Sequence, residues 1–557
     1  MKKVSPSRHV CFLILITFFS QSIFSQTAIP AGNVSGLWSQ VNSPYNINGN
    51  ITIPADSMLT VEPGVIIKFQ GNFKFTVLGQ LIAVGLATDT IVFTSQFSTP
   101  SLRWNGLRFL TNTSIDTSKV SYCKLEKGFA QGMPGPKEDC GGAIYISQYS
   151  NLVISNSSIV NNWANVNGGG ICCYSSNPII KNNFINNNSS QQGGGIFLNS
   201  SNGIISENNI SNDTAGLSSG GAIFLDLFSN PIISKNSLTN NYAYVGGAGI
   251  SCTSANPSII GNIITNNNGD GGSGAILCSS SSPTLINNII CNNTSFSGGG
   301  GAISCYYSSS PTLINNTIAN NNSDEVGGSV YCLGSSNPTF INCILYGNTT
   351  QMAYPQVHLY DSTCHPNFIN CDIENGIYSI GDTAYVYYSG NFQNNIDLAP
   401  AFSSPTLGSG ISYNALIANW SLQTISPCIN SGIMDTTGLN LPPTDYAGNP
   451  RIIGRIDIGA IEDQSNVSTN EIIFNSTFLL FPNPSEGKAN LFLDNLNNEN
   501  FELEIVSSNG QLLFNKKLSN NSKLIEQIDL TNYINGIYFV KIKNAHISQV
   551  EKLIILK

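Results

Sequence analysis

Residues 168–198 read GGGICCYSSNPIIKNNFINNNSSQQGGGIFL, and this stretch is one unit of a pattern that returns from Gly141 to Cys332. Each unit opens with a glycine pair, one or two small residues and an aliphatic residue. The aliphatic positions recur at steps of 25 to 27 residues: Ile144, Ile171, Ile196, Ile223, Ile250, Ile276, Ile303 and Val330. A fixed period in this range predicts stacked units, each contacting mainly its neighbours, instead of one globular core.

Inside each unit, short apolar runs alternate with corners of Ser, Asn and Pro. Runs such as Ile179-Ile180 are followed by asparagine pairs such as Asn182-Asn183. No window carries ten residues with the 3.6-residue apolar period of a helix, and asparagine tolerates the left-handed backbone of tight turns. The sequence therefore predicts an all-β fold with three short strands and three turns per unit. We expect a right-handed parallel β-helix, a solenoid with about 4.8 Å between coils.

A second column of side chains lies two residues beyond each aliphatic position, and it is apolar throughout. Its members are Ile146, Cys173, Leu198, Leu225, Cys252, Cys278, Cys305 and Cys332. Because alternate residues of a strand share a face, we expect this column to point into the core, where free cysteine behaves as a small hydrophobe. Bridges between neighbouring coils fit the distance but require a dihedral angle that parallel side chains seldom adopt. The sequence leaves the redox state of Cys252, Cys278, Cys305 and Cys332 open.

The repeated motifs resemble those of a known group of proteins. Gly-Gly-Ala-Ile occurs at 141–144, 220–223 and 300–303, and Phe184-Ile185-Asn186-Asn187 lies between two glycine blocks. These motifs resemble the repeats of polymorphic outer-membrane proteins and related bacterial surface β-helices over residues 140–375. The resemblance implies a β-helix at the cell surface and implies no particular reaction.

The flanking segments suggest further divisions of the chain. Residues 1–25 combine Lys2, Lys3 and Arg8 with a short apolar run, as in a secretory signal peptide, and nothing later predicts a transmembrane span. We assign 26–50 to an N-terminal cap, 51–395 to the β-helix, 396–462 to a C-terminal cap segment and 463–475 to a linker. In the cap segment, we expect Arg451 to pair with Asp445 or Asp457.

A change in composition marks residues 476–557 as a separate domain, because the Gly/Asn repeat stops and lysine becomes frequent. Alternating strands and Asn-Gly turns predict a small β-sandwich. The segments 480–484 (LFPNP), 506–512 (VSSNGQL), 535–542 (NGIYFVKI) and 552–557 (KLIILK) resemble the type A sorting domain of type IX secretion. This resemblance implies the type IX machinery as a partner and export through the periplasm to the cell surface or medium.

Charge and composition narrow the functional classes. The chain of 557 residues has a formal net charge of −9, only 10% charged residues and no basic run, so nucleic acid is not expected as a partner. No cofactor is expected. The segment Asp270-Gly271-Gly272-Ser273-Gly274 resembles a glycine-rich calcium turn, but it occurs once, so calcium is only a weak candidate and no other metal site is predicted.

A polysaccharide lyase or glycoside hydrolase of the pectin-lyase-like β-helix class is the alternative function. A lyase needs a basic residue to take a proton, and between residues 182 and 450 the only Lys or Arg is Lys235. The candidates are therefore Arg103, Arg108, Lys137 and Asp139, in the densest run of charge. His358 and His365, and the singly placed Asp213, Asp226, Asp270, Asp324 and Glu325, suggest no catalytic pair.

The leading hypothesis is a non-catalytic, adhesin-like protein that binds glycan or protein ligands. The loop before each glycine block varies most, and in it lie Trp163, Tyr242, Tyr244 and Phe296. Aromatic rings at coil spacing are suited to stacking on sugar rings, although they could equally pack on neighbouring loops. A structural component of a surface layer is a third hypothesis.

Overall fold

The computed structural model describes residues 26–111, 116–132, 139–351, 354–381, 388–465, 478–494, 501–508, 510–518, 523–543 and 548–557. The chain divides into two compact units, with the boundary between Gln464 and Ser465. The predicted signal peptide, Lys137 and most of the predicted linker lie outside the described residues. The described part holds four short 3-10 helices and no α-helix: η1 (Gln40–Asn42), η2 (Pro100–Leu102), η3 (Gly376–Ser379) and η4 (Ala415–Ile417).

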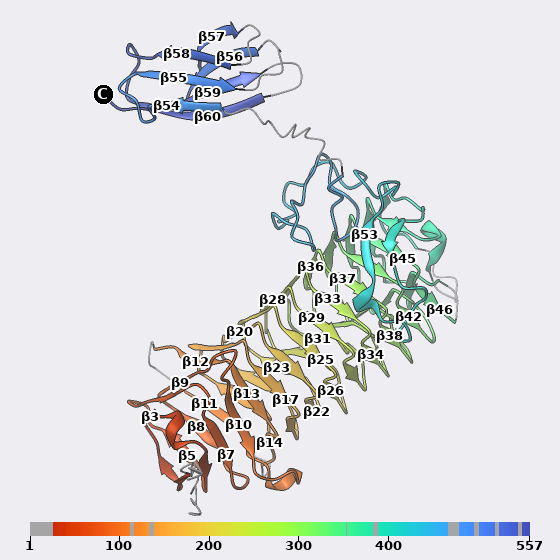
Figure 1. Ribbon diagram of the computed structural model, residues 1–557. Helices are drawn as coiled ribbons and strands as arrows, with labels where there is room; N and C mark the ends of the chain where they lie inside the picture. The colour runs from red at the N-terminus through yellow and green to blue at the C-terminus, as the bar shows by residue number, and fades with distance from the viewer. Residues whose placement is uncertain are drawn as a thin grey trace, which may run out of the picture. The chain divides into compact units, whose positions relative to one another are not determined.

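The first unit is a parallel β-solenoid (Figure 1). Three fourteen-stranded sheets run along it: sheet A from β1 (Thr27–Ile29) to β49 (Asp372–Ile373), sheet B from β2 (Gly32–Asn33) to β50 (Ile380–Gly381), and sheet C from β3 (Gly36–Trp38) to β51 (Phe392–Gln393). One central coil runs through β19 (Ile171–Tyr174) in sheet B, β20 (Ile179–Lys181) in sheet C and β21 (Phe184–Asn186) in sheet A. The expected solenoid is confirmed.

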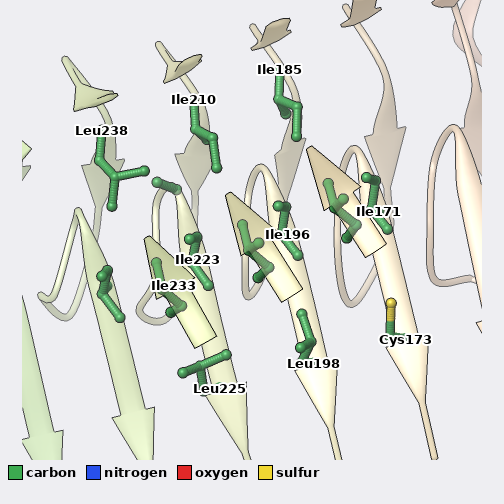
Figure 2. Close-up of a cluster of buried hydrophobic side chains, with 14 of the residues drawn as sticks. Ile171, Cys173, Ile185, Ile196, Leu198, Ile210, Ile223, Leu225, Ile233 and Leu238 are labelled. Carbon is green, nitrogen blue, oxygen red and sulfur yellow. The ribbon is translucent and has the colours of Figure 1, made fainter. Parts of the chain in front are cut away.

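Both predicted columns of sheet B are confirmed, and they form much of the core. Ile171 pairs in register with Ile144 and Ile196, and Cys173 with Ile146 and Leu198; the same register continues to Val330 and Cys332. All of these side chains are buried. Figure 2 shows how equivalent side chains repeat from coil to coil, such as Ile196 and Ile223 in one column and Leu198 and Leu225 in the other. The core is therefore continuous along the solenoid axis, as stacked units require.

A fourth sheet, which the sequence analysis does not anticipate, adds a short strand to most coils. Sheet D contains nine strands of two residues each, because the polar segment after the second asparagine corner also pairs with its neighbours. Its strands are β14 (Phe129–Ala130), β18 (Trp163–Ala164), β22 (Ser189–Ser190), β26 (Thr214–Ala215), β30 (Tyr242–Ala243), β34 (Asn268–Gly269), β38 (Thr294–Ser295), β42 (Asn322–Ser323) and β46 (Thr349–Thr350). The central repeat thus has four strands, so the count of three is wrong.

The two residues of each asparagine pair have different structural roles. The first residue takes the left-handed conformation, with φ of +55° at Asn182 and +54° at Asn187. The second, Asn183 or Asn188, is buried and joins a ladder of side chains. Asn183, for example, donates from both its backbone N and its Nδ2 to Oδ1 of Asn208 on the next coil, at 2.9 and 3.0 Å, and from Nδ2 to the Ile154 carbonyl. Each ladder satisfies buried amide groups that would otherwise be costly.

The two ends of the solenoid differ from simple caps. Residues 26–50 already contribute the first strand of sheets A, B and C, together with β4 (Tyr45–Ile47) of sheet A. Residues 396–464, here called the return segment, fold back over the outer face of sheet A on the last coils. Trp420, Phe402 and Ile458 pack there against Ile289 and Ile344. The return segment therefore covers a side of the solenoid.

The second unit consists of two antiparallel sheets around its own core. One sheet has the order β54 (Phe478–Phe481), β55 (Lys488–Asp494), β58 (Lys523–Asp529). The other has the order β57 (Leu512–Leu518), β56 (Phe501–Ser507), β59 (Gly536–Lys543), β60 (Ser548–Ile555). Leu491, Ile505, Val540 and Leu553 are buried together between them. Antiparallel sheets sharing one core are what the alternating sequence predicts.

Candidate functional site

The glycine blocks set the path of the variable loops. Gly168 has φ of +63°, and a Cβ atom placed on it would lie 2.3 Å from the carbonyl oxygen of Ile171 and 2.8 Å from Cβ of Cys172. Gly193 repeats this arrangement over Ile196 and Phe197. Only glycine fits, because the chain here crosses closely over the outer face of sheet B. Each loop that precedes a glycine block therefore lies beside the strands of sheet D.

Sheet D places two of the predicted ligand-binding aromatics in one column. Trp163 pairs in register with Phe129 and Ser189, and Tyr242 with Thr214 and Asn268. Three coils separate Trp163 from Tyr242, which is roughly 14 Å at the usual strand spacing. The Trp163 ring stacks on Phe129 with centroids 4.4 Å apart and an angle of 14°. Phe129 is a partner that the sequence analysis misses, because it precedes the repeats.

A neighbouring column alternates aromatic and acidic side chains. Tyr244, Asp270, Phe296 and Asp324 each lie two residues beyond their sheet D strand start, and each backbone N–H bonds to the preceding coil. Tyr244 is 52% exposed and Phe296 42%. The Tyr242 hydroxyl donates to Oδ2 of Asp270 over 3.4 Å. Burial and the negative charge of Asp270 raise the pKa of Tyr242. We call Tyr242, Tyr244, Asp270, Phe296 and Asp324 the aromatic-acid edge.

Three of the basic residues in the charge-dense segment of the alternative catalytic region lie on three different sheets. Arg108 lies on sheet B in β11 (Leu107–Leu110), Lys119 on sheet C in β12 (Ser118–Ser121) and Lys124 on sheet A in β13 (Cys123–Glu126). Lys124 forms a 2.7 Å ion pair with Glu126. Because consecutive strands of a coil belong to different sheets, charges that are dense in the sequence are distributed over three faces.

The individual candidates of that region have structural partners. Arg108 is buried, donates to the carbonyl of Cys140 and to Oδ1 of Asn105, and lies over the Tyr145 ring at 5.5 Å. Arg103 is partly exposed and donates from Nε to the Ser98 carbonyl over 3.0 Å. The Asp139 carbonyl accepts from the Val166 N–H. Arg108 therefore holds backbone segments together beneath the surface.

The histidines and the buried carboxylates are also integrated into the structure. His358 is buried and stacks on Tyr331, with ring centroids 5.4 Å apart, and His365 Nδ1 lies 3.1 Å from the Ser389 hydroxyl. Asp213 occupies an asparagine-ladder position, and Asp372 accepts a 3.2 Å hydrogen bond from the Cys428 thiol. Burial raises the pKa of Asp372 to about 7.

In the return segment, the structure gives Arg451 a different partner from the two expected carboxylates. Its Nε lies 3.9 Å from Oε2 of Glu462, and its Nη2 donates to the carbonyl of Gly459 over 2.8 Å. Asp445 and Asp457 accept from backbone N–H groups, at Asn449 and Asn430. These charged groups are buried together, which fits the expected structural role.

A second aromatic group lies on the outer side of sheet B in late coils. Tyr306 and Tyr331 have centroids 5.7 Å apart, and Tyr331 and Tyr360 6.1 Å. Tyr307 and Tyr360 are largely exposed. The repeat pattern does not reveal this group, because Tyr306 pairs in register with Leu333 and Tyr331 with Ser304, so the two rings occupy different positions of the repeat.

Within the described ranges, no helix is long and apolar enough to cross a membrane. The same residues contain no group of three His, Cys, Asp or Glu side chains that could hold a metal ion.

Comparison with protein families agrees with this architecture. Residues 105–290 match the model described as a right handed beta helix region, and residues 479–556 match the secretion system C-terminal sorting domain. A search of curated proteins finds no match. The second unit is thus an address for secretion, and its presence indicates export to the cell surface or the extracellular space. The chain is a right-handed parallel β-helix repeat protein that carries a C-terminal type IX secretion sorting domain.

Proposed function

We propose that the exported solenoid is a non-catalytic, adhesin-like protein that binds a glycan along the aromatic-acid edge. The observation that carries the proposal is the exposure of Tyr244 and Phe296 in one straight column, two coils or about 10 Å apart. Rings with an exposed face can stack on the apolar faces of sugars, and the regular coil spacing suits a ligand with its own repeat. Protein ligands are the other class that such an edge can serve.

The charge around this edge restricts the ligand further. Between residues 182 and 450 the sequence has thirteen acidic residues and a single basic one, Lys235. Asp270 and Asp324 lie within the edge itself. A polyanion such as an acidic polysaccharide would be repelled, whereas a neutral or positively charged glycan would not. A lyase site on these coils would also lack a basic residue beside its acidic substrate, so the lyase alternative depends on residues 103–139.

The test is retention of the mature protein on a panel of immobilised neutral, cationic and anionic polysaccharides, with assays for new reducing or unsaturated ends. Retention without cleavage is expected. Tyr244→Ala and Phe296→Ala should each weaken binding about 3- to 10-fold, the effect of losing one ring contact.

Phe228→Ala is the matched control, because Phe228 is 73% exposed but lies at the corner after sheet B. If Phe228→Ala weakened binding equally, the binding site could not be assigned to the aromatic-acid edge. Cleavage of an acidic polysaccharide would establish the enzyme alternative instead.

A further inference from the structure

Two cysteines outside the core columns meet on the outer face of sheet B. Cys172 lies in β19, where its side chain points away from the core and packs with Tyr145 and Phe197. Cys140 lies in the segment just before the first glycine block. Cys140 belongs to the same buried cluster of side chains as Cys172, both are free thiols in this structure, and both are almost completely buried, at 3% and 0% exposure.

Backbone contacts on both sides fix the position of Cys140. The Val166 N–H donates to the carbonyl of Asp139 over 3.0 Å, and the Gly141 N–H donates to the carbonyl of Asn167 over 2.8 Å. Arg108 donates to the carbonyl of Cys140 itself. Cys140 is therefore held over the coil that contains Cys172.

The approach of these two thiols differs from that of the core cysteines. Cys278 and Cys305 lie side by side in register on parallel strands, and their side chains run parallel. Parallel side chains seldom give the dihedral of about 90° that a disulfide requires. Cys140 and Cys172 come from a crossing loop and a strand, so their Cα–Cβ bonds are not held parallel.

We propose that Cys140 and Cys172 form a disulfide bond in the exported protein. Extracellular and periplasmic proteins meet an oxidising environment, and the sorting domain directs this chain there. The hydrogen bond from the Cys172 thiol lowers the pKa of Cys140, which favours Cys140 as the attacking thiolate. The bond links the segment directly before Gly141 to strand β19 of the next coil.

The reaction is a thiol–disulfide exchange with a disulfide donor, either a dithiol oxidoreductase in its oxidised form or a small disulfide. The Cys140 thiolate attacks one donor sulfur, forms a mixed disulfide and releases the first donor thiolate. The Cys172 thiolate then attacks the Cys140 sulfur and displaces the second. Two protein thiols are oxidised, the donor disulfide is reduced to two thiols, and the two protein protons pass to the released sulfurs.

The direct test is made on the full exported protein, denatured without reductant and alkylated with N-ethylmaleimide. Chymotryptic cleavage after Tyr145, Trp163 and Tyr174 separates a Cys140 peptide from a Cys172-Cys173 peptide. We expect these peptides to be joined, two hydrogen atoms lighter than their sum, and to separate on reduction. The pair Cys278 and Cys305, in register on parallel strands, should be alkylated and serves as an internal control.

Variants assign the bond within the Cys172-Cys173 peptide. Cys172→Ser should abolish the cross-link, whereas Cys173→Ala, which alters the inward column, should retain it. Reductant should lower the melting temperature of the wild type and leave that of Cys140→Ser unchanged. Alkylation of Cys140 and Cys172 without prior reduction, or a bond from Cys140 to Cys173, would overturn the proposal, and the wild-type measurement decides this even where a variant does not fold.

Discussion

At the scale of single residues, Asp213 is the exception in an otherwise uniform ladder. Its Oδ1 accepts two hydrogen bonds from Asn188, as an asparagine oxygen does elsewhere, but its buried Oδ2 has no hydrogen-bond partner among the described residues. At the next position, Asn241 uses its Nδ2 to donate to the Ile210 carbonyl and to Oδ1 of Asn267. Asp213 Oδ2 stands where such a donor belongs, so the geometry fits a protonated carboxyl group.

Asp213→Asn should therefore stabilise the solenoid at neutral pH. Burial raises the pKa of Asp213 well above its ordinary value, so the folded state keeps a proton that the unfolded chain releases above about pH 4. The protonated carboxyl group of Asp213 makes its full contribution to the free energy of unfolding below about pH 4. As the pH rises from there toward the folded-state pKa, this contribution falls by about 1.4 kcal/mol for each pH unit.

Thermal or denaturant unfolding from pH 4 to 8 measures this effect as the difference between variant and wild type. The advantage of Asp213→Asn should grow with pH. A variant less stable than the wild type at pH 7 would contradict the protonated ladder position.

At the scale of elements, the same turn asparagines serve two purposes along the solenoid. Asn182 is exposed, whereas Asn315, at the equivalent turn of a late coil, is buried beneath the return segment. Asn315 Nδ2 donates to the carbonyls of Asp457 and Gly459, over 2.8 and 3.2 Å. Asn266 and Asn292 hold other parts of the return segment in the same way. The turns of the late coils thus anchor the return segment.

Asn315→Ala should cost about 1–3 kcal/mol more than Asn182→Ala, because it removes two buried hydrogen bonds to the return segment and leaves the Asp457 and Gly459 carbonyls to Arg451 alone. Both residues have positive φ, so the control removes the shared cost of placing alanine in that conformation. Melting temperature and the rate of proteolysis within residues 396–464 are the readouts. Equal losses in the two variants would show that the side-chain bonds of Asn315 contribute little.

How far the sequence predicts these elements depends on repetition. The sheet B columns were predictable, because the same buried position carries an aliphatic residue or Cys every 25 to 27 residues. Sheet D was not, since strands such as Ser189–Ser190 are two residues long and polar. The path of the return segment was also hidden, because it lacks the repeat and its partners, such as Ile289, are distant in the sequence. For the candidate site, the sequence was enough to propose the aromatic positions. The distances between them and their exposure could be known only from the strand register of sheet D.

At the scale of the whole molecule, the balance of charge decides which polymers can approach. The predominance of acidic residues over residues 182–450 predicts retention of an amino-sugar polymer such as chitosan and exclusion of pectate. Chitosan retention should weaken as salt rises from 50 to roughly 500 mM, because screening shortens the reach of surface charge.

Asp270→Asn combined with Asp324→Asn should reduce chitosan retention more than Glu207→Gln, which lies at an exposed corner between sheets C and A. Affinity chromatography at several salt concentrations gives both comparisons. Pectate held as strongly as chitosan would contradict the electrostatic argument.

The asparagine ladders also constrain how such a protein can change length during evolution. Each ladder residue bonds within its own coil or to an adjacent one, so duplication of a coil-length segment of the gene would extend the solenoid by one step and create no unmatched partner. The anchoring asparagines from Asn266 to Asn370 limit this freedom, since each is matched to a particular point of residues 396–464. Growth by duplication is therefore compatible with the early coils, while the late coils and the return segment must be inherited as one block.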